Sequence, residues 1–258
     1  MKTAFISGAT SGIGLALAKQ LSEQGYSLIL HGRNTSVLNQ LQATLNQVAL
    51  TITADLSSSA GLAHLVAQLD DYPHAIDVAI NNAGFGLYGE HLNLAEHDID
   101  AMLQLNMISL TKLSRYFAER MIKQGQGHIM NVASTAAYQP QPYMAAYAAS
   151  KAYVASLTES LALELKPHKV VVTCLSPGRT DTGFFTFAGE DSAKAGNGTF
   201  AGKNRTSPER VAKLGLAALF SGKSREIPLF ENKFFVFLNR LLPRNAVLRI
   251  YHQAMQNI

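Results

Sequence analysis

Short apolar runs alternate along almost the whole chain with longer segments whose apolar residues recur at helical spacing. In the first helical segment, Ile13, Leu17 and Leu21 lie four residues apart and so share one helix face. Seven apolar runs separated by such segments predict an α/β fold: a doubly wound, seven-stranded parallel sheet with helices on both faces. The predicted strands lie at 3–6, 27–31, 48–53, 77–81, 127–132, 169–175 and 226–229, and the later helical segments at about 37–45, 58–70, 98–124, 147–166 and 208–221.

No internal repeat or charged linker divides the chain, so we predict one domain over residues 1–231 and an extension over 232–258. Of the 258 residues, 47% are hydrophobic and 16% are charged, which is enough apolar surface for a large core. A long irregular stretch at about 179–207 is rich in Gly, Thr, Phe and Lys, and we expect it to form a substrate lid. Four phenylalanines there suggest an apolar substrate, although such residues serve packing as often as recognition: Phe184, Phe185, Phe187 and Phe200.

The extension predicts two short amphipathic helices, separated by Pro243 because proline cannot continue a helix. Leu248 and Ile250 resume an apolar pattern after this break. The apolar stripe of the first helix consists of Phe234, Leu238, Leu241 and Leu242, and Phe235 and Phe237 widen it.

The formal net charge of +4 lies entirely in the extension, because no Asp or Glu follows Glu231 whereas Lys233, Arg240, Arg244 and Arg249 do. The remaining chain balances at zero and lacks the basic and aromatic clusters of a nucleic-acid-binding face. A basic amphipathic segment fits an anionic membrane surface, a cover over a substrate pocket or a contact with a partner subunit. We favour packing, on the same domain or within a homodimer or homotetramer, because the chain has no lipidation motif.

The remaining composition bears on compartment and metals. Cys174, the lone cysteine, cannot form an internal disulfide, and its apolar surroundings indicate a buried structural thiol. No apolar run approaches the roughly 18 residues of a membrane-spanning helix, and no leader is evident, so we expect a cytoplasmic protein. The eight histidines show no metal-ligand spacing, so we expect no metal.

A glycine-rich segment stands between the first predicted strand and the first predicted helix. Glycines at 8, 12 and 14 allow a tight turn and the close approach of a pyrophosphate to the N–H groups at the helix N-terminus. In this position the segment predicts a dinucleotide site, and a purely structural turn is the alternative.

The end of the second predicted strand bears on which dinucleotide is bound. An enzyme that uses NAD usually places Asp or Glu there, where it bonds to the adenosine ribose hydroxyls. This chain has Gly32 followed by Arg33, and a guanidinium pairs well with a 2′-phosphate. The sequence therefore favours NADP(H) as cofactor, the alternative being that Arg33 is a solvated cation at a helix start.

Tyr147 and Lys151 are four residues apart on a predicted helix, so both can address one ligand. The spacing is selective within this chain, since Tyr138, Tyr143 and Tyr153 have no lysine four positions on. With its other motifs, the chain resembles the short-chain dehydrogenase/reductase family over residues 1 to about 230. In order, these motifs are Ser7 to Gly14, Asp55 with Leu56, Asn81 to Gly84, Asn106, Ser134, Tyr147 to Lys151, and Pro177 with Gly178.

This resemblance implies a Rossmann-like fold and an oxidoreductase that interconverts a carbonyl and an alcohol by hydride transfer. It implies that Tyr147 is the general acid/base, that Lys151 holds the nicotinamide ribose, that Ser134 orients the substrate oxygen and that Asn106 anchors a water. The expected cofactor contacts are Gly8, Thr10, Ser11, Gly12, Ile13, Gly14, Arg33, Asp55, Leu56, Asn82, Ala83, Gly84, Tyr147, Lys151, Pro177, Gly178, Thr180 and Thr182.

The chemistry of these residues agrees with the implied roles, because an ammonium beside a phenol favours the phenolate. We therefore expect Lys151, helped by the oxidised nicotinamide, to lower the pKa of Tyr147. The structural alternatives are an exposed pair of side chains for Tyr147 and Lys151, a backbone hydrogen bond for Asn106 and a helix cap for Asp55.

Two other functions compete with this one. A catalytically silent dinucleotide sensor would use the same fold. A sugar epimerase or dehydratase would carry a substrate domain for which this chain has no room. The chain also departs from the family pattern: Ser7 stands where threonine is usual, and Ser11 lacks the basic side chain of many NADP-dependent members.

Overall fold

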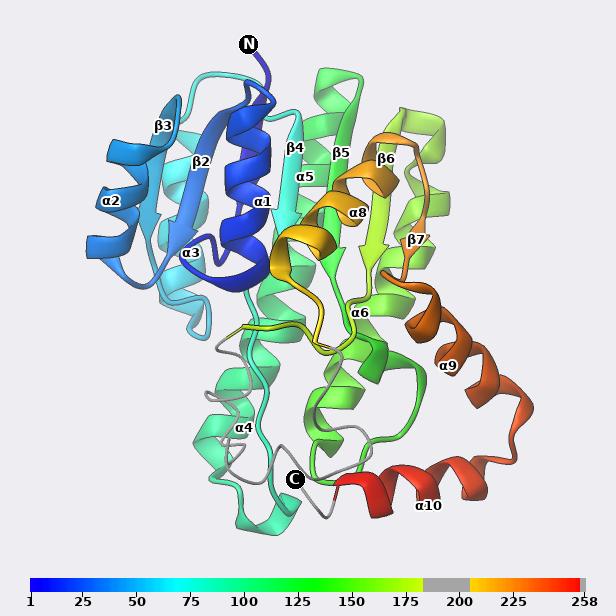
Figure 1. Ribbon diagram of the computed structural model, residues 1–258. Helices are drawn as coiled ribbons and strands as arrows, with labels where there is room; N and C mark the ends of the chain where they lie inside the picture. Colours follow the sequence, from blue (N-terminus) through cyan, green and yellow to red (C-terminus); the bar gives the residue numbers. More distant parts are fainter. Residues whose placement is uncertain (183–204, 256–258) are drawn as a thin grey trace.

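The computed structural model describes residues 1–182 and 205–255, and these build a seven-stranded parallel sheet in the order β3-β2-β1-β4-β5-β6-β7 (Figure 1). This arrangement, with helices on both faces, confirms the predicted doubly wound α/β fold. The strands are β1 (Thr3–Ile6), β2 (Ser27–Gly32), β3 (Val48–Thr53), β4 (Val78–Asn81), β5 (Gly127–Val132), β6 (Val170–Leu175) and β7 (Arg225–Glu226).

The helices form two layers around the sheet. Helices α1, α2 and α8 cover one face, and α3, α5 and α6 cover the other. Within 1–182 and 205–255, no helix combines the length and the apolarity that crossing a membrane requires. The bounds are α1 (Gly12–Glu23), α2 (Thr35–Thr44), α3 (Ser59–Asp70), α4 (Glu96–Leu103), α5 (Leu110–Gln124), α6 (Ala145–Glu164), α8 (Pro208–Phe220), α9 (Phe230–Leu241) and α10 (Arg244–Met255).

Alternate residues of the central strands point into the two layers. Ile6 and Leu30 belong to the cluster under α1, α2 and α8, whereas Phe5 and Ile29 belong to the cluster under α3 and α5. All four side chains are fully buried. Because a parallel sheet is covered on both faces, its strands are apolar at consecutive positions, and this made them visible in the sequence.

A buried polar network fastens the two central strands to the helices behind them. The Asn131 side-chain oxygen on β5 accepts from Asn81 Nδ2 of β4 at 2.8 Å and from Ser114 Oγ of α5 at 3.1 Å. Asn131 Nδ2 donates to Thr158 Oγ1 of α6 at 3.1 Å. Since a buried polar group is costly without a partner, these bonds fix α5 and α6 against β4 and β5.

Two elements differ from the sequence predictions. The helix predicted at 98–124 consists of α4, a π-helical turn at Gln104–Ser109, and α5. The last strand is only Arg225–Glu226 instead of 226–229. Pro228 has no N–H to donate, and Leu229 adopts a left-handed φ of 70°, so the strand cannot continue.

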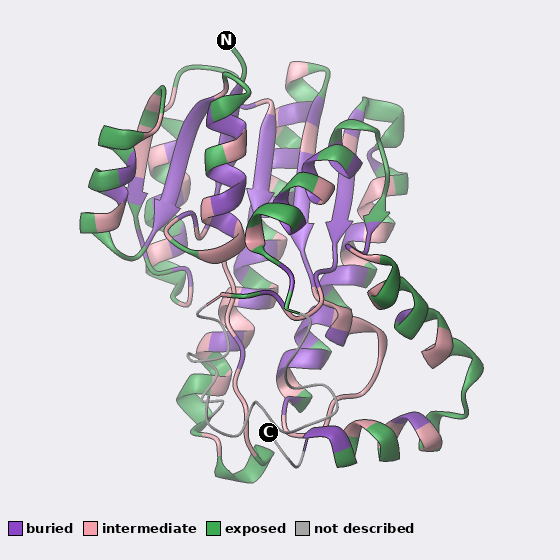
Figure 2. Cartoon of the chain, in the orientation of Figure 1, coloured by how far each residue is buried: buried purple, intermediate pink, exposed green. Residues whose placement is uncertain are grey.

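The extension contains the two predicted helices, with Pro243 between them. In Figure 1, α9 descends along the edge of the molecule after β7, and α10 returns across its lower side. Val236 of α9 and Val247, Ala254 and Met255 of α10 are buried, whereas most of α9 is exposed (Figure 2). Residues 183–204 of the expected lid lie outside the described residues.

Two leucine substitutions test how much a buried and an exposed side chain contribute to the free energy of unfolding. We expect Leu65→Ala, whose side chain is fully buried in α3, to lower the free energy of unfolding by about 2–5 kcal/mol through lost burial and a residual cavity. The matched variant Leu163→Ala changes a residue of α6 that is 74% exposed, and we expect a change below about 0.5 kcal/mol. Urea unfolding monitored by circular dichroism measures both, and equal losses would contradict the assignment of Leu65 to the core.

Candidate active site

The candidate site lies where the strand order changes direction, at the carboxyl ends of β1 and β4. Connections from these two strands run to opposite sides of the sheet, and such a point leaves a crevice for ligands. The Ser7 hydroxyl, at the end of β1, accepts hydrogen bonds from the backbone N–H groups of Asn82 and Ala83, both at 3.0 Å. Asn82 Nδ2 in return donates to the carbonyls of Ser7 at 3.0 Å and Gly8 at 3.2 Å. These bonds join the two loops that border the crevice.

The glycine segment is shaped so tightly that a side chain is excluded at its glycine positions. Gly8 adopts a left-handed φ of 67°, and a Cβ placed on Gly14 would lie 2.1 Å from the Gly8 carbonyl oxygen. The backbone therefore turns directly into the N-terminus of α1, as a site for a pyrophosphate requires. Ser11 is the N-cap residue of α1 but makes no side-chain cap bond, and Thr10 packs against Gly32.

His31 supports the glycine segment from below, a role that the sequence analysis missed. Its ring Nε2 donates to the Ala54 carbonyl at 3.1 Å, and its Nδ1 accepts from the Gly8 N–H at 3.4 Å. One nitrogen must carry a proton while the other must not, so the ring is neutral. Burial lowers the pKa of His31 to about 4, although the Ala54 hydrogen bond and Asp55 act in the opposite direction.

Arg33 and Asp55 follow the ends of β2 and β3, and both are exposed. Asp55 Oδ1 accepts from Ser57 N at 3.0 Å and from Ser57 Oγ at 2.7 Å. Desolvation raises the pKa of Asp55, but the Ser57 hydrogen bonds and the Arg33 charge outweigh it, so the net pKa is lowered. Leu56 is buried, and its carbonyl accepts from Ser109 Oγ at 2.7 Å.

Tyr147, Ser134 and Lys151 come together as the spacing predicts. Tyr147 and Lys151 are buried on α6, and the Ser134 side chain is hydrogen bonded to Tyr147. Lys151 Nζ donates to the Val132 carbonyl at 2.9 Å and lies 5.9 Å from the centroid of the Tyr147 ring. A Cβ placed on Gly84 would lie 3.3 Å from this nitrogen, so the loop after β4 closes over the lysine.

Asn106 is fully buried in the π-helical turn, and its side chain makes three hydrogen bonds. Its Nδ2 donates to the Phe85 carbonyl at 2.9 Å and to Ser150 Oγ at 3.2 Å, and its Oδ1 accepts from the Phe85 N–H at 3.2 Å. Ser150, absent from the predicted set, donates in turn to the Tyr147 carbonyl at 2.7 Å. Asn106 thus connects the loop after β4 with α6. Its bonds to the Phe85 backbone agree with the structural role given above as the alternative to anchoring a water.

Burial shifts the tyrosine and the lysine in opposite directions. It raises the pKa of Tyr147 to about 12, against a smaller lowering by the Ser134 hydrogen bond. It lowers the pKa of Lys151 to about 8. Desolvation of the phenolate therefore dominates the pKa of Tyr147, and the lowering expected from Lys151 together with the oxidised nicotinamide stays a prediction.

The segment after β6 approaches both the glycine segment and the extension. The Pro177 carbonyl accepts from Thr135 N at 2.9 Å, next to Ser134, and Thr180 Oγ1 donates to the Gly178 carbonyl at 3.1 Å. Thr182 meets the glycine segment, since a Cβ on Gly12 would lie 2.9 Å from its methyl carbon. Asn232 of α9 packs on Gly178, where a Cβ would lie 2.5 Å from its side-chain oxygen. No sequence signal pointed to Asn232.

Apolar side chains from four segments pack around Tyr147. The loop after β4 contributes Phe85, Leu87 and Tyr88, and α10 contributes Met255, whose carbonyl accepts a hydrogen bond from the Tyr88 hydroxyl. The buried members are Met102, Ala136, Met144, Tyr147, Ala148 and Met255. These contacts join positions far apart in the chain, so no sequence pattern indicates them.

Comparison with known proteins identifies the family. Residues 2–193 match the family model described as short chain dehydrogenase. An uncharacterized oxidoreductase of Staphylococcus epidermidis is 35% identical over 181 residues, which cover 70% of this chain and 79% of that protein. The chain belongs to the short-chain dehydrogenase/reductase family and is an oxidoreductase of that family.

Two solved structures show the same architecture. A short-chain dehydrogenase from Sphingobium yanoikuyae in complex with NADPH has a TM-score of 0.83 and 28% identity, covering 96% of each chain. A 3-ketoacyl-(acyl-carrier-protein) reductase from Brucella melitensis complexed with NADH has a TM-score of 0.75 and 26% identity, covering 88% of this chain and 95% of the other. The family thus includes proteins that bind either nicotinamide dinucleotide.

The buried His31 ring predicts a pH dependence of stability. Its pKa in the folded chain is about 4, against an ordinary value of 6.5, so between these values the unfolded chain takes up a proton that the folded chain does not. Stability therefore falls as the pH drops from about 6.5 to about 4, by about 3 kcal/mol from this group.

We expect His31→Gln to reduce the difference in unfolding free energy between pH 7 and pH 4 by about that amount, because glutamine takes up no proton there. Urea unfolding at the two pH values measures it. His64→Gln, on the exposed surface of α3, is the matched control and should follow the unmodified protein. An unchanged pH dependence in His31→Gln would contradict the role of His31.

Proposed function

We propose that the chain is an NADP(H)-dependent oxidoreductase that interconverts a carbonyl and a primary or secondary alcohol on an apolar substrate, in the cytoplasm. The observation that carries this proposal is the buried arrangement of Tyr147, Ser134 and Lys151 beside the crevice between β1 and β4. The buried Cys174 thiol, whose pKa burial raises to about 11, is consistent with a reducing compartment.

The residues around the crevice fit a nicotinamide dinucleotide. The glycines at 8, 12 and 14 let the backbone of the first loop come close to a ligand, and Gly84 lets the loop after β4 pass close to Lys151. We propose that Thr10, Ser11, Gly12 and Ile13 meet the pyrophosphate, that Asp55 and Leu56 border the adenine, and that Asn82, Ala83, Pro177, Gly178, Thr180 and Thr182 line the nicotinamide side. The bound cofactor supplies or accepts the hydride.

The side chains then handle the proton. With a pKa of about 12, Tyr147 is a protonated phenol at neutral pH and can donate to an alkoxide that develops on the substrate. The Ser134 hydroxyl gives this oxygen a second, preplaced hydrogen bond. Lys151, with a pKa of about 8, carries a charge at neutral pH, so it can bind a ribose hydroxyl and favour the phenolate when an alcohol is oxidised.

Arg33 supports the preference for NADPH. It is exposed at the end of β2, where Gly32 takes the place of the acidic residue that would bind ribose hydroxyls and repel a phosphate. The Arg33 charge lowers the pKa of Asp55, but the Asp55 carboxylate is itself hydrogen bonded to Ser57. A guanidinium in this position suits a 2′-phosphate.

The substrate preference rests on the surroundings of Tyr147. The neighbouring side chains Phe85, Leu87, Tyr88, Met144 and Met255 are apolar or aromatic. Such a lining favours a substrate with a sizeable apolar body, held by few polar contacts besides those to Ser134 and Tyr147.

We expect Tyr147→Phe to lower kcat by about 100-fold or more, because only the proton-transferring hydroxyl is lost. Folding and NADPH affinity should stay nearly unchanged, as measured by circular dichroism and fluorescence titration. Tyr153→Phe, on the same helix but 37% exposed, is the matched control and should retain full turnover. More than half of the original turnover in Tyr147→Phe, with chemistry rate-limiting, would rule out Tyr147 as the proton donor.

We expect the protein to bind NADPH more tightly than NADH, and Arg33→Ala to weaken NADPH binding by roughly 10- to 100-fold, the size of a charge-assisted hydrogen bond. NADH binding should change little. Arg115→Ala, which removes an exposed arginine of α5, should leave both affinities unchanged. Equal affinity of the unmodified protein for the two dinucleotides, measured by calorimetry, would overturn the assignment.

A further inference from the structure

Helix α9 has two faces with opposite surroundings. Asn232, Val236 and Asn239 lie on the inner face: Val236 is buried, Asn232 packs on Gly178, and Asn239 Nδ2 donates to Gln139 Oε1 at 3.0 Å. Phe230, Phe234, Phe237 and Leu241 lie on the outer face, which Figure 2 shows as exposed. This spacing of four, three and four residues keeps the outer side chains within about 60° around the helix.

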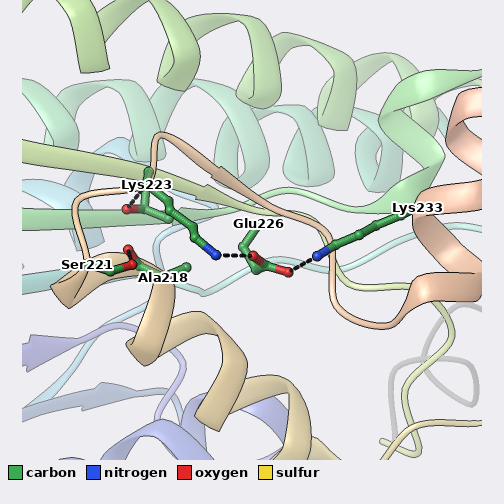
Figure 3. Close-up of polar contacts among 6 residues, drawn as sticks. Ala218, Ser221, Lys223, Glu226 and Lys233 are labelled. Atoms are coloured by element: carbon green, nitrogen blue, oxygen red, sulfur yellow. Dashed lines mark hydrogen bonds and ion pairs between the residues drawn. The ribbon is translucent and has the colours of Figure 1, made fainter.

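An ion pair between a buried carboxylate and a half-exposed lysine holds α9 in this orientation. Glu226, at the end of β7, has a side chain that is only 8% exposed and pairs with Lys233 Nζ at 2.8 Å. Figure 3 shows this carboxylate between Lys233 and Lys223, whose Nζ lies 3.8 Å away. Since a buried carboxylate is costly without its partner, the pair fixes the first turns of α9 against the sheet edge. The outer face is consequently directed away from the body.

The outer face is strongly apolar and unusually exposed. Phe230 is 80% exposed, Phe237 is 56% exposed and Leu241 is 65% exposed. Phe235 at 49% and Leu242 at 41% extend this surface around the helix. Together these side chains span about 160° of the circumference, which is wider than the narrow seam of a helix pair. Within this arc only Glu231, in the first turn of α9, is not apolar.

Positive charge borders this face. Arg240 and Arg244 lie beside its C-terminal end and are exposed, and no acidic residue follows Glu231 in the sequence. Within the described ranges, no carboxylate lies within 4.0 Å of either guanidinium in an ion pair. Their charges are available to an anionic partner, whereas that of Lys233 is committed to Glu226.

We propose that the outer face of α9, with Arg240 and Arg244, docks the enzyme on an anionic lipid surface. Phenylalanine and leucine side chains would enter the boundary between headgroups and acyl chains, and the arginines would contact lipid phosphates. This occupant fits better than a second copy of the chain. The extension of a second copy carries the same excess of positive charge, so it would not complement Arg240 and Arg244.

The experiment uses the full chain without cofactor or substrate, so its outcome is independent of the proposed reaction. Sedimentation is measured with vesicles of phosphatidylcholine, alone or mixed with an equal part of phosphatidylglycerol. We expect binding to the mixed vesicles in low salt, at least about 10-fold weaker binding to phosphatidylcholine alone, and loss of binding near 1 M salt, where charges are screened beyond about 3 Å. Absence of binding to the mixed vesicles in low salt would overturn the proposal.

Matched variants locate the contact. We expect Phe234→Asp with Phe237→Asp, and Arg240→Glu with Arg244→Glu, each to weaken binding by at least about 10-fold. Leu163→Asp, at a position 74% exposed on α6, and Lys112→Glu with Lys123→Glu on α5 make comparable changes elsewhere and should bind normally. If the Asp pair unfolds the protein, Phe234→Ser with Phe237→Ser tests the same face.

Light scattering after size exclusion reports a competing occupant. If the Phe234 and Phe237 variants change the oligomeric state while their vesicle binding stays normal, the outer face is an interface between copies of the chain, and the proposal is wrong. An unchanged oligomeric state together with weakened vesicle binding supports it.

Discussion

The site depends on one small polar contact, the exchange of hydrogen bonds between Ser7 and Asn82. β1 and β4 are neighbours in the sheet, but Ser7 and Asn82, in the loops that follow them, are 75 residues apart in the sequence. The Ser7 hydroxyl accepts hydrogen bonds from two backbone N–H groups of the second loop. The Asn82 side chain donates to two backbone carbonyls of the first loop. Four bonds thereby set the width of the crevice at the switch point. A hydroxyl is sufficient for this purpose, which explains why serine can stand at position 7 where the family usually has threonine.

Among the described residues, burial and no carboxylate sets the pKa values of Tyr147 and Lys151. Tyr147 and Lys151 are placed by the same turn of α6 in the same apolar surroundings, and desolvation favours the neutral form of both. The consequences differ because the ordinary pKa values differ. The raised pKa of Tyr147 keeps its hydroxyl protonated at pH 7. The lowered pKa of Lys151 still leaves its amine charged at pH 7. Burial therefore prepares Tyr147 for proton donation at neutral pH.

Much of the fold could be predicted because its signals are local. Strands buried on both faces are apolar at successive positions, and helices show their own period, so all seven strands were located before the structure was considered. The length of β7 was wrong, since Pro228 and the left-handed Leu229 limit it and only the second depends on tertiary context. The π-helical turn was not predicted either. It follows from the bonds that Asn106 makes to Phe85 and Ser150, neither of which is near it in sequence.

The candidate site divides in the same way. Motif residues with fixed spacing, such as Tyr147 and Lys151 on one helix, were placed correctly with respect to each other. Four residues of the site carry no sequence signal for their contacts: His31, Ser150, Asn232 and Met255. Each contacts a partner that is far away in the sequence, or it bonds to a backbone group. The rise in the pKa of Tyr147 on burial leaves no sequence signal for a related reason. Spacing shows which groups are near, but the extent of desolvation depends on the whole fold.

The position of Met255 has a consequence for the order in which the protein is made. Met255 lies 29 residues beyond Glu226, the last residue of the sheet, yet it packs in the cluster around Tyr147. During synthesis, N-terminal parts of a chain generally acquire structure first. All seven strands and both loops that border the crevice are therefore synthesised before Met255, which completes the cluster around Tyr147. A nascent chain passes through a stage in which its sheet is complete and the surroundings of Tyr147 are still open on the side that α10 later covers.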